Sequence, residues 1–218
     1  MIKIEEVDVY GWEAAIRGMR NPMNSWDKSD SGYAEKIVGV YEELPEYAEL
    51  EFVVGDNDLK LMRALSKAGS DHGKFLRMIT VTLDITAPLY WWKEFDTYKV
   101  GTVANSCSTM HKIHDKEFEL DDFSHEHLSE LGIEYLKDTV SMLNRAREAY
   151  LKTKDKLCWW DMIQLLPTSY NQKRTVQLNY QVLKSMYHAR KAHKLDEWVE
   201  FCNWCETLPY FRKICIDC

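Results

Sequence analysis

The amino-acid sequence predicts one domain, residues 1–218, of the mixed α/β (α+β) class, and three observations indicate this class. Apolar and polar residues alternate over residues 79–86, which is the pattern of a strand. Apolar residues recur at every third or fourth position over residues 128–150, as they do in an amphipathic helix. With 218 residues, of which 45% are hydrophobic and 29% charged, the chain has the size and composition of one well-buried globular domain.

Charge and composition narrow the possible functions. The net charge of −7 argues against a general nucleic-acid-binding surface, because neutralising a phosphate backbone requires a basic face. A small phosphorylated ligand needs only a few local cations and is not excluded. No apolar run is long enough for a membrane span, and the acidic N-terminus does not look like a signal peptide. We therefore expect a cytoplasmic protein whose six cysteines are reduced.

Aromatic residues are unusually frequent, with eight Trp and twelve Tyr. Large rings either fill a hydrophobic core or offer stacking surfaces for a flat cofactor or base. We favour the core for most of them, and one or two rings can serve both purposes.

The N-terminal segment predicts a strand, a short helix and a polar loop. Residues 2–9 form the strand, and the helix of residues 11–19 ends at Asn21-Pro22, since the residue before a proline disfavours helix. After the polar loop, an acidic segment over residues 42–51 leads into a short strand at residues 50–54.

The central segment predicts a helix, the strand of residues 79–86 and a second helix. The first helix is capped by Asp56 or Asn57 and ends at Gly69. The second begins after Pro88, because a proline in the first helical turn loses no hydrogen bond. A polar loop rich in Gly, Thr, Ser and Asn follows, and such loops often carry function.

The C-terminal half predicts two helices, a strand and a third helix. A long amphipathic helix over residues 127–154 begins near Ser124, and a short helix follows at residues 157–166. An alternating strand occupies residues 175–178, and Asn179 then opens the last of these helices.

Two patterns were considered as metal sites. His125 and His127 are two residues apart and point to different sides of a helix, so they do not form a zinc pair. The Cys202-x-x-Cys205 and Cys215-x-x-Cys218 pairs could supply four thiolates to a structural zinc ion. Cys202 lies in a helical pattern with Trp198, however, so we favour core packing and a reduced terminal thiol, and we predict no metal.

Asn179 and Arg190 are expected to share one helix face. They are close to three helical turns apart, and apolar residues lie between them on that face. Arg190 therefore either contacts a ligand or extends its charged end from an apolar stripe into water.

The order of these motifs resembles that of the flavin-dependent thymidylate synthase family over roughly residues 10–200. The family has a Gly-His turn, a strand ending in Ala-Pro, a helix with Arg-Gln, and a charged signature loop. The corresponding residues here are His72, Ala87-Pro88, Lys93-Glu94, Thr97-Tyr98-Lys99 and Asn105–His111. A third block of the family corresponds to Leu166-Pro167, Asn179, Arg190, His193 and Trp198.

The resemblance implies a fold, an activity and partners. The fold is a bent, mainly antiparallel sheet packed with long helices, assembled as a homotetramer with active sites between subunits. The activity is C5 methylation, or a related one-carbon transfer, on a pyrimidine deoxynucleotide such as dUMP. FAD is the cofactor, and NADPH and methylenetetrahydrofolate are the co-substrates.

The resemblance also implies roles for individual residues. The catalytic residues are Arg190 and Ser108. The substrate contacts are Lys93, Glu94, Ser108 and Arg190, and the cofactor contacts are His72, Lys99, Asn105, Asn179 and His193. Arg17, Arg20, Asn24 and Ser25 are weaker candidates, for which solvated surface is the favoured interpretation.

Several family residues are replaced. Cations of the signature loop are missing at Thr97, Tyr98, Val100 and Met110, a Glu is replaced by Ser106, and a flavin-facing His by Met78. Each lost charge-assisted contact is worth ~1.5–3 kcal/mol. An alternative function is therefore a family relic that binds a nucleotide or a protein partner without flavin redox chemistry.

Overall fold

The computed structural model describes residues 2–38 and 47–218, and the chain divides into two compact units. Unit 1 comprises Met1–Val7, Thr82–Gln177 and Ala192–Phe201. Unit 2 comprises Asp8–Val81, Leu178–Lys191 and Cys202–Cys218. The single-domain organisation stays a prediction. No helix in these described ranges is long and apolar enough to cross a membrane.

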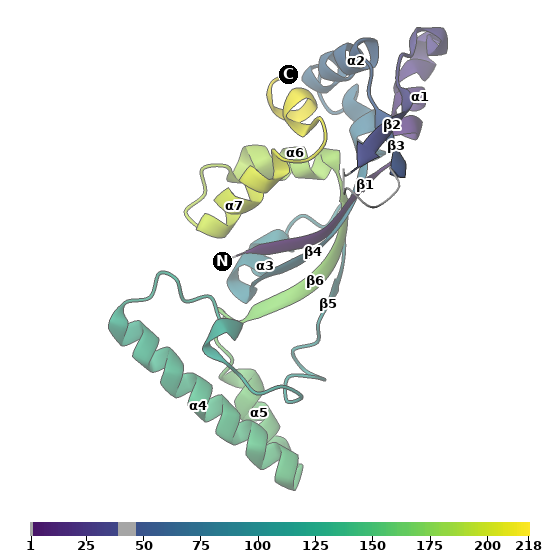
Figure 1. The fold of residues 1–218 in the computed structure, drawn as a ribbon. Helices are drawn as coiled ribbons and strands as arrows, with labels where there is room; N and C mark the ends of the chain where they lie inside the picture. The colour runs from purple at the N-terminus through teal and green to yellow at the C-terminus, as the bar shows by residue number, and fades with distance from the viewer. Residues whose placement is uncertain (1, 39–46) are drawn as a thin grey trace. The chain divides into compact units, whose positions relative to one another are not determined.

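The strands form one four-stranded and one two-stranded sheet (Figure 1). The larger sheet has the order β1-β4-β6-β5. Its strands are β1 (Lys3–Tyr10), β4 (Thr80–Pro88), β5 (Val103–Ser106) and β6 (Asn171–Asn179). The smaller sheet pairs β2 (Gly32–Val38) with β3 (Tyr47–Val53) in antiparallel register. Because β5 and β6 are antiparallel as well, the predicted mixed class with an antiparallel sheet is confirmed.

Seven helices accompany the sheets in the described ranges. They are α1 (Trp12–Arg20), α2 (Asp56–Lys67), α3 (Leu89–Phe95), α4 (Glu130–Thr153), α5 (Lys156–Gln164), α6 (Tyr180–Arg190) and α7 (Asp196–Cys205). Short single turns occur at Asn21–Met23, Trp26–Lys28, Gly73–Arg77, Leu120–Asp122 and Arg212–Ile216.

The alternation predicted around residues 79–86 is present in β4. Its apolar side chains are buried, while the intervening polar ones are half-buried. Pro88 is the N-cap of α3, so the helix begins directly after this proline, as predicted. The buried Trp91 and Trp92 follow in the first turn of the helix.

An aromatic core stabilises unit 1. Trp91, Trp92 and Phe95 of α3 are at most 1% exposed, and Trp198 and Phe201 of α7 are completely buried. The ring centroids of Trp91 and Trp198 are 4.8 Å apart, which is a favourable aromatic contact. The Trp92 indole N–H donates to the carbonyl oxygen of Gln172 at 2.9 Å, so its polar atom is satisfied. The core interpretation of the aromatic excess is confirmed for these rings.

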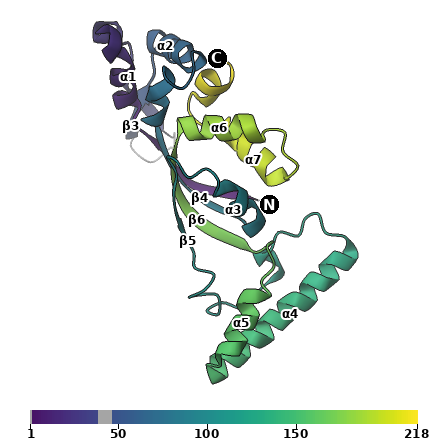
Figure 2. The same ribbon diagram turned by 180° about the vertical axis from the view of Figure 1, so that it is seen from behind.

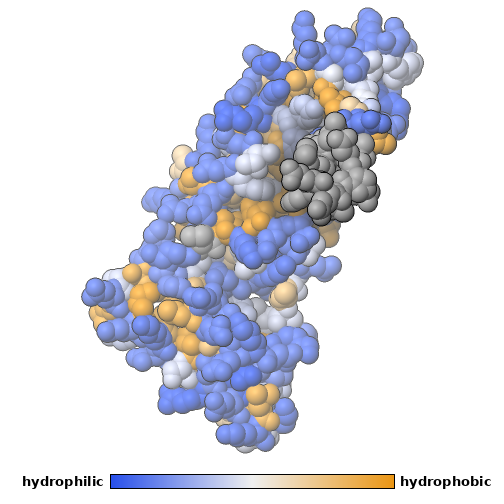
Figure 3. Space-filling model, in the orientation of Figure 1, coloured by the Kyte–Doolittle hydropathy of each residue, from blue (hydrophilic) through white to orange (hydrophobic). Residues whose placement is uncertain are grey.

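Helices α4 and α5 of unit 1 lie side by side in both views (Figures 1 and 2). Leu136 and Leu143 of α4 pack with Met162 of α5 in one hydrophobic cluster. Other leucines at these helices stay exposed, and hydrophobic residues gather on the surface of α4 in Figure 3. The exposed leucines are Leu128, Leu131, Leu151, Leu157 and Leu165.

The start of α4 corrects the prediction. The sequence suggested Ser124, but Ser129 caps the helix by accepting from Gly132 N, and the helix begins at Glu130. Ser124 instead donates its hydroxyl to Asn171 Oδ1 at 2.9 Å, so it ties a loop to the start of β6.

Helices α1, α2 and α6 belong to unit 2. Gly11 precedes α1 with φ of 91°, and a Cβ there would lie 2.1 Å from Met78 O, so only glycine fits. Trp12 packs on Tyr180 at a centroid distance of 5.4 Å. Asn179 caps α6 by accepting from Val182 N at 3.1 Å, as predicted.

The cap of α2 differs from the prediction. Neither Asp56 nor Asn57 is the N-cap; Gly55 holds that position without a side-chain bond. The carboxylate of Asp30 accepts from Asn57 N at 2.9 Å and from Asp58 N at 3.1 Å. The capping carboxylate therefore comes from a loop distant in sequence.

Two further predictions need qualification. The polar loop before Met110 contains strand β5, and the strand predicted at residues 175–178 extends over all of β6. The predicted strand at residues 50–54 corresponds to β3. Residues 42–46 of the acidic segment lie outside the described residues.

Cysteines of the tail belong to the core of unit 2. Cys202, Cys205 and Cys215 are at most 2% exposed, and Cys218 is half-buried. Burial raises the pKa of Cys202 to about 11 and of Cys215 to about 12, so both remain neutral thiols. The core interpretation is confirmed for the three buried cysteines. Within residues 2–38 and 47–218, no three His, Cys, Asp or Glu side chains are grouped to hold a metal ion.

Candidate functional site

A pocket of about 530 Å³ in unit 1 brings two predicted site residues together. Tyr90 and Glu94 of α3 line it from one side, and His193, Lys194 and Leu195 line it from the segment before α7. Its volume lies within the range of about 300–1,000 Å³ that is usual for small-molecule sites.

Glu94 and His193 form a polar pair in this pocket. Glu94 Oε2 and His193 Nε2 are 3.3 Å apart, and the side chains are 33% and 24% exposed. His193 Nδ1 accepts the backbone N–H of Leu195 at 3.2 Å. A neutral His193 must therefore carry its proton on Nε2, which faces the Glu94 carboxylate.

Tyr90 contributes a wall rather than a reactive group. Its hydroxyl donates to the carboxylate of Glu197, which is 5% exposed. Burial and this carboxylate raise the pKa of Tyr90 well above its ordinary value, so the hydroxyl stays protonated. The sequence analysis missed Tyr90, although Tyr90 and Glu94 are four residues apart on one helix face.

The other predicted site residues of unit 1 lie outside the pocket lining. Lys93, Lys99 and Asn105 are exposed, and so is Ser108. Ser108 Oγ accepts from Met110 N at 3.2 Å and from His111 N at 2.9 Å. The Ser108 hydroxyl therefore shapes its own turn, and its proton remains available for donation.

Strand β6 fixes the start of the same loop. Cys107 N donates to Lys173 O at 2.9 Å, and Gln172 Nε2 donates to Cys107 O at 2.7 Å. Asn105 pairs with Thr175 in the β5–β6 register. The Asn105 side chain is thus presented to solvent from a hydrogen-bonded strand.

The remaining predicted residues belong to unit 2. His72 is exposed before the turn of Gly73–Arg77, and Asn179 and Arg190 are half-buried. Asn179 caps the start of α6, and Arg190 is its last residue. At 1.5 Å per residue, the helix separates them by about 16 Å, so one small ring cannot contact both.

Arg20 is structural, which corrects the solvated-surface interpretation. It is 4% exposed, and its Nε lies 2.6 Å from Asp58 Oδ1. Its other nitrogens donate to the backbone oxygens of Ser25 at 3.1 Å and Lys28 at 3.0 Å. Asn24 is exposed, as expected for solvated surface.

Comparison with known proteins shows the fold. No protein-family model and no curated protein sequence matches the chain. Solved structures of flavin-dependent thymidylate synthases share its architecture along nearly the whole chain, so the protein has a fold of this kind.

Two structures of such synthases and one of a nucleotide methylase show the likeness. Thymidylate synthase X from Helicobacter pylori with FAD and dUMP has a TM-score of 0.67 at 16% identity, covering 100% of this chain and 99% of that one. Flavin-dependent thymidylate synthase ThyX from Helicobacter pylori, complexed with FAD and dUMP, gives 0.64 at 17% identity, covering 98% and 99%. The UMP/dUMP methylase PolB from Streptomyces cacaoi, bound with 5-Br dUMP, gives 0.55 at 13% identity, covering 84% and 75%.

Proposed function

We propose that the protein binds a pyrimidine deoxynucleotide such as dUMP at the Glu94–His193 pocket and transfers a one-carbon unit to C5 with the help of reduced flavin. The observation that carries this proposal is the meeting of Glu94 and His193, which are far apart in sequence, at one pocket. The proposal is supported by a fold that the chain shares with proteins complexed with FAD and dUMP.

The pocket chemistry suits a pyrimidine ring. The Glu94 carboxylate accepts hydrogen bonds, as the N–H of a uracil imide requires, and the Nε2–H of His193 faces this carboxylate and orients it. Lys194 adds a cation beside them, which favours a phosphate group. Tyr90 and Leu195 provide apolar surface that a flat ring can contact.

The loop before β5 has donors that fit part of a flavin dinucleotide. Lys99 of this loop and Asn105 of β5 itself are exposed and can hydrogen-bond to phosphate and ring oxygens. Thr102 Oγ1 is buried and has no hydrogen-bond partner among the residues described, so a ligand could satisfy it. FAD is the cofactor that we propose; the hydride for C5 reduction would come from its reduced form.

The proposal includes NADPH as reductant, methylenetetrahydrofolate as carbon donor, and a cytoplasmic homotetramer. The exposed leucines of α4 and α5 support assembly, since an apolar surface of this kind is commonly covered by another subunit. From the family resemblance alone, we also propose Arg190 and Ser108 as catalytic residues, Lys93 as a substrate contact, and His72 and Asn179 as cofactor contacts. None of these residues lines the Glu94–His193 pocket.

Calorimetric titration tests the proposal. We expect dUMP to bind the wild type in the presence of FAD, and Glu94→Ala to weaken its affinity by ~1.5–3 kcal/mol, as for a lost hydrogen bond to a charged group. Glu134→Ala removes an exposed carboxylate of α4 in the same unit and should leave binding unchanged. No binding to the wild type, or equal binding by Glu94→Ala, would contradict the proposal.

A second candidate function is nucleotide or protein binding without redox chemistry. It is favoured by Met78, which is 43% exposed and occupies the position where the resembled family has a flavin-facing histidine. The visible spectrum of the purified protein, recorded after adding FAD and gel filtration, separates the two functions. Retained flavin absorbance supports the enzyme, and a colourless protein that still binds dUMP supports the second candidate.

A further inference from the structure

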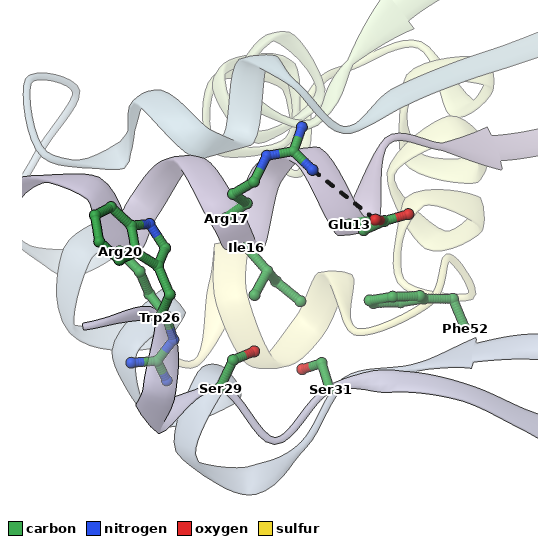
Figure 4. A pocket seen from close by; sticks show the side chains of 8 residues that line it. All are labelled: Glu13, Ile16, Arg17, Arg20, Trp26, Ser29, Ser31 and Phe52. Carbon is green, nitrogen blue, oxygen red and sulfur yellow. Dashed lines mark ion pairs between the residues drawn. The ribbon is translucent and has the colours of Figure 1, made fainter. Parts of the chain in front are cut away.

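A separate cavity of about 240 Å³ lies within unit 2, between α1, β3 and the loop that follows Trp26 (Figure 4). None of its lining residues belongs to the Glu94–His193 pocket. Figure 4 shows the Ile16 side chain between two aromatic rings, with serines on one side and Arg17 on the other.

Two aromatic side chains close opposite ends of this cavity. Trp26 is 50% exposed, and its Nε1 donates to Asn21 Oδ1 at 2.9 Å, which fixes the orientation of the indole. Phe52 is backed by Tyr33, with ring centroids 5.2 Å apart. Rigid aromatic walls with an aliphatic side chain between them favour a flat ring as occupant.

The serines of the cavity offer only hydrogen-bond acceptors. Ser29 Oγ and Ser31 Oγ both lie 2.7 Å from Asp58 Oδ2. Burial alone would raise the pKa of Asp58, but hydrogen bonds from Ser31, Ser29 and Arg20 outweigh it and hold that pKa below its ordinary range. The carboxylate is therefore ionised, and both hydroxyl protons are committed to it. Ser31 Oγ also accepts the backbone N–H of Gly55 at 2.9 Å. A ligand must therefore supply N–H or O–H donors to the lone pairs that remain on the two serines.

Arg17 is the exposed cation of this cavity, and Glu13, which also lines it, is the exposed carboxylate. The Arg17 side chain is 65% exposed, and its guanidinium is 3.8 Å from Glu13 Oε1, at the outer limit of an ion pair. Arg20, in contrast, already donates to Asp58, Ser25 and Lys28. An anionic group of a ligand would therefore pair with Arg17.

From this geometry we propose that the cavity binds a small single-ring heterocycle that carries N–H donors and one carboxylate. The ring would lie against Ile16 with Trp26 at one end and Phe52 at the other, its N–H edge would face Ser29 and Ser31, and its carboxylate would pair with Arg17. The volume is below the usual range of about 300–1,000 Å³, so the occupant is a single ring rather than a dinucleotide. This site goes beyond the function proposed for the Glu94–His193 pocket.

Calorimetry with three probes tests the assignment on the full chain. Orotate has both N–H donors and a carboxylate, benzoate has only the carboxylate, and uracil has only the N–H donors. We expect orotate to bind at least tenfold more tightly than either of the others. Arg17→Gln should weaken orotate binding at least tenfold and leave uracil binding unchanged, whereas Trp26→Ala should weaken both.

Lys74→Gln serves as the matched control, because it removes another exposed cation of unit 2 that does not line the cavity. It should bind orotate like the wild type. Thermal melts should show that Arg17→Gln is folded, as expected for an exposed side chain. The proposal is overturned if orotate does not bind the wild type at millimolar concentration, if benzoate or uracil binds equally well, or if Arg17→Gln binds orotate unchanged.

Discussion

Two polar pairs, one in each unit, show how a carboxylate and a basic side chain can serve different purposes. In unit 2, Arg20 and Asp58 are 2.6 Å apart, with side chains 5% and 0% exposed. In unit 1, His193 and Glu94 are 3.3 Å apart and remain 24% and 33% exposed. The first pair is enclosed by its own hydrogen bonds, and the second faces a pocket of about 530 Å³.

The two pairs differ in how many hydrogen bonds each makes to other protein groups. Asp58 accepts from Arg20, Ser29 and Ser31 and from the backbone of Asp30, so it organises the loop before β2. A partly exposed pair such as Glu94–His193 contributes only ~0–1 kcal/mol to folding, because solvent screens it. A polar pair that adds little to stability but lines a pocket is a better candidate for ligand binding than a saturated buried one.

The largest expected effect is on the buried pair. Asp58→Asn should lower the free energy of unfolding by ~3–5 kcal/mol, because it leaves the Arg20 charge buried without a counter-charge. Urea unfolding at neutral pH measures this loss. Glu94→Gln is the matched control and should change the free energy of unfolding by less than ~1 kcal/mol. Similar losses in the two variants would remove the distinction between the pairs.

The same variant makes a prediction about pH. The pKa of Asp58 is lowered in the folded protein, so its ionised form stabilises the fold above the unfolded-state pKa of about 3.9. The stability difference between wild type and Asp58→Asn should be constant at neutral pH and shrink as the pH falls through the folded-state pKa. A difference that grew on acidification would have the wrong sign for this account.

A smaller effect is expected at Asn179, which has a structural role and a proposed ligand role. Asn179→Ala should lower the free energy of unfolding by ~1 kcal/mol through loss of the α6 cap. Asn179→Ser keeps a capping oxygen and should recover most of this stability. If Asn179 also contacts flavin, both variants should bind FAD more weakly. If both variants bound FAD as tightly as the wild type, the proposed contact between Asn179 and flavin would be wrong, and capping α6 would be its role.

The sequence predicted those structural elements whose signal lies in a few neighbouring residues. The alternation in β4 and the capping side chain of Asn179 are visible in the sequence, and both have the predicted structure. Capping of α2 by Asp30 was not predictable in this way, because the carboxylate comes from a distant loop. Strand β5 was missed because every residue in it is exposed, so it shows no alternation.

Individual residues of the candidate site could be predicted from the sequence, but the contact between their side chains could not. The family resemblance selected Glu94 and His193, yet only the fold shows that their side chains meet. Arg20 was read as solvated surface because an arginine in a polar segment usually is; its buried partner Asp58 lies on another helix. Tertiary packing determines which side chains from distant segments come into contact, and local sequence patterns do not contain this information.

The central claim is that Glu94 and His193 act together in one nucleotide site. A double-mutant cycle tests this claim most directly. Calorimetry would measure the affinity for dUMP in the presence of FAD for four proteins: the wild type, Glu94→Ala, His193→Ala and the double variant. We predict that each single substitution weakens binding about tenfold or more, and that the double variant is little worse than the weaker single one, since contacting residues couple. Single variants that bind like the wild type, or losses that add independently, would contradict a shared site.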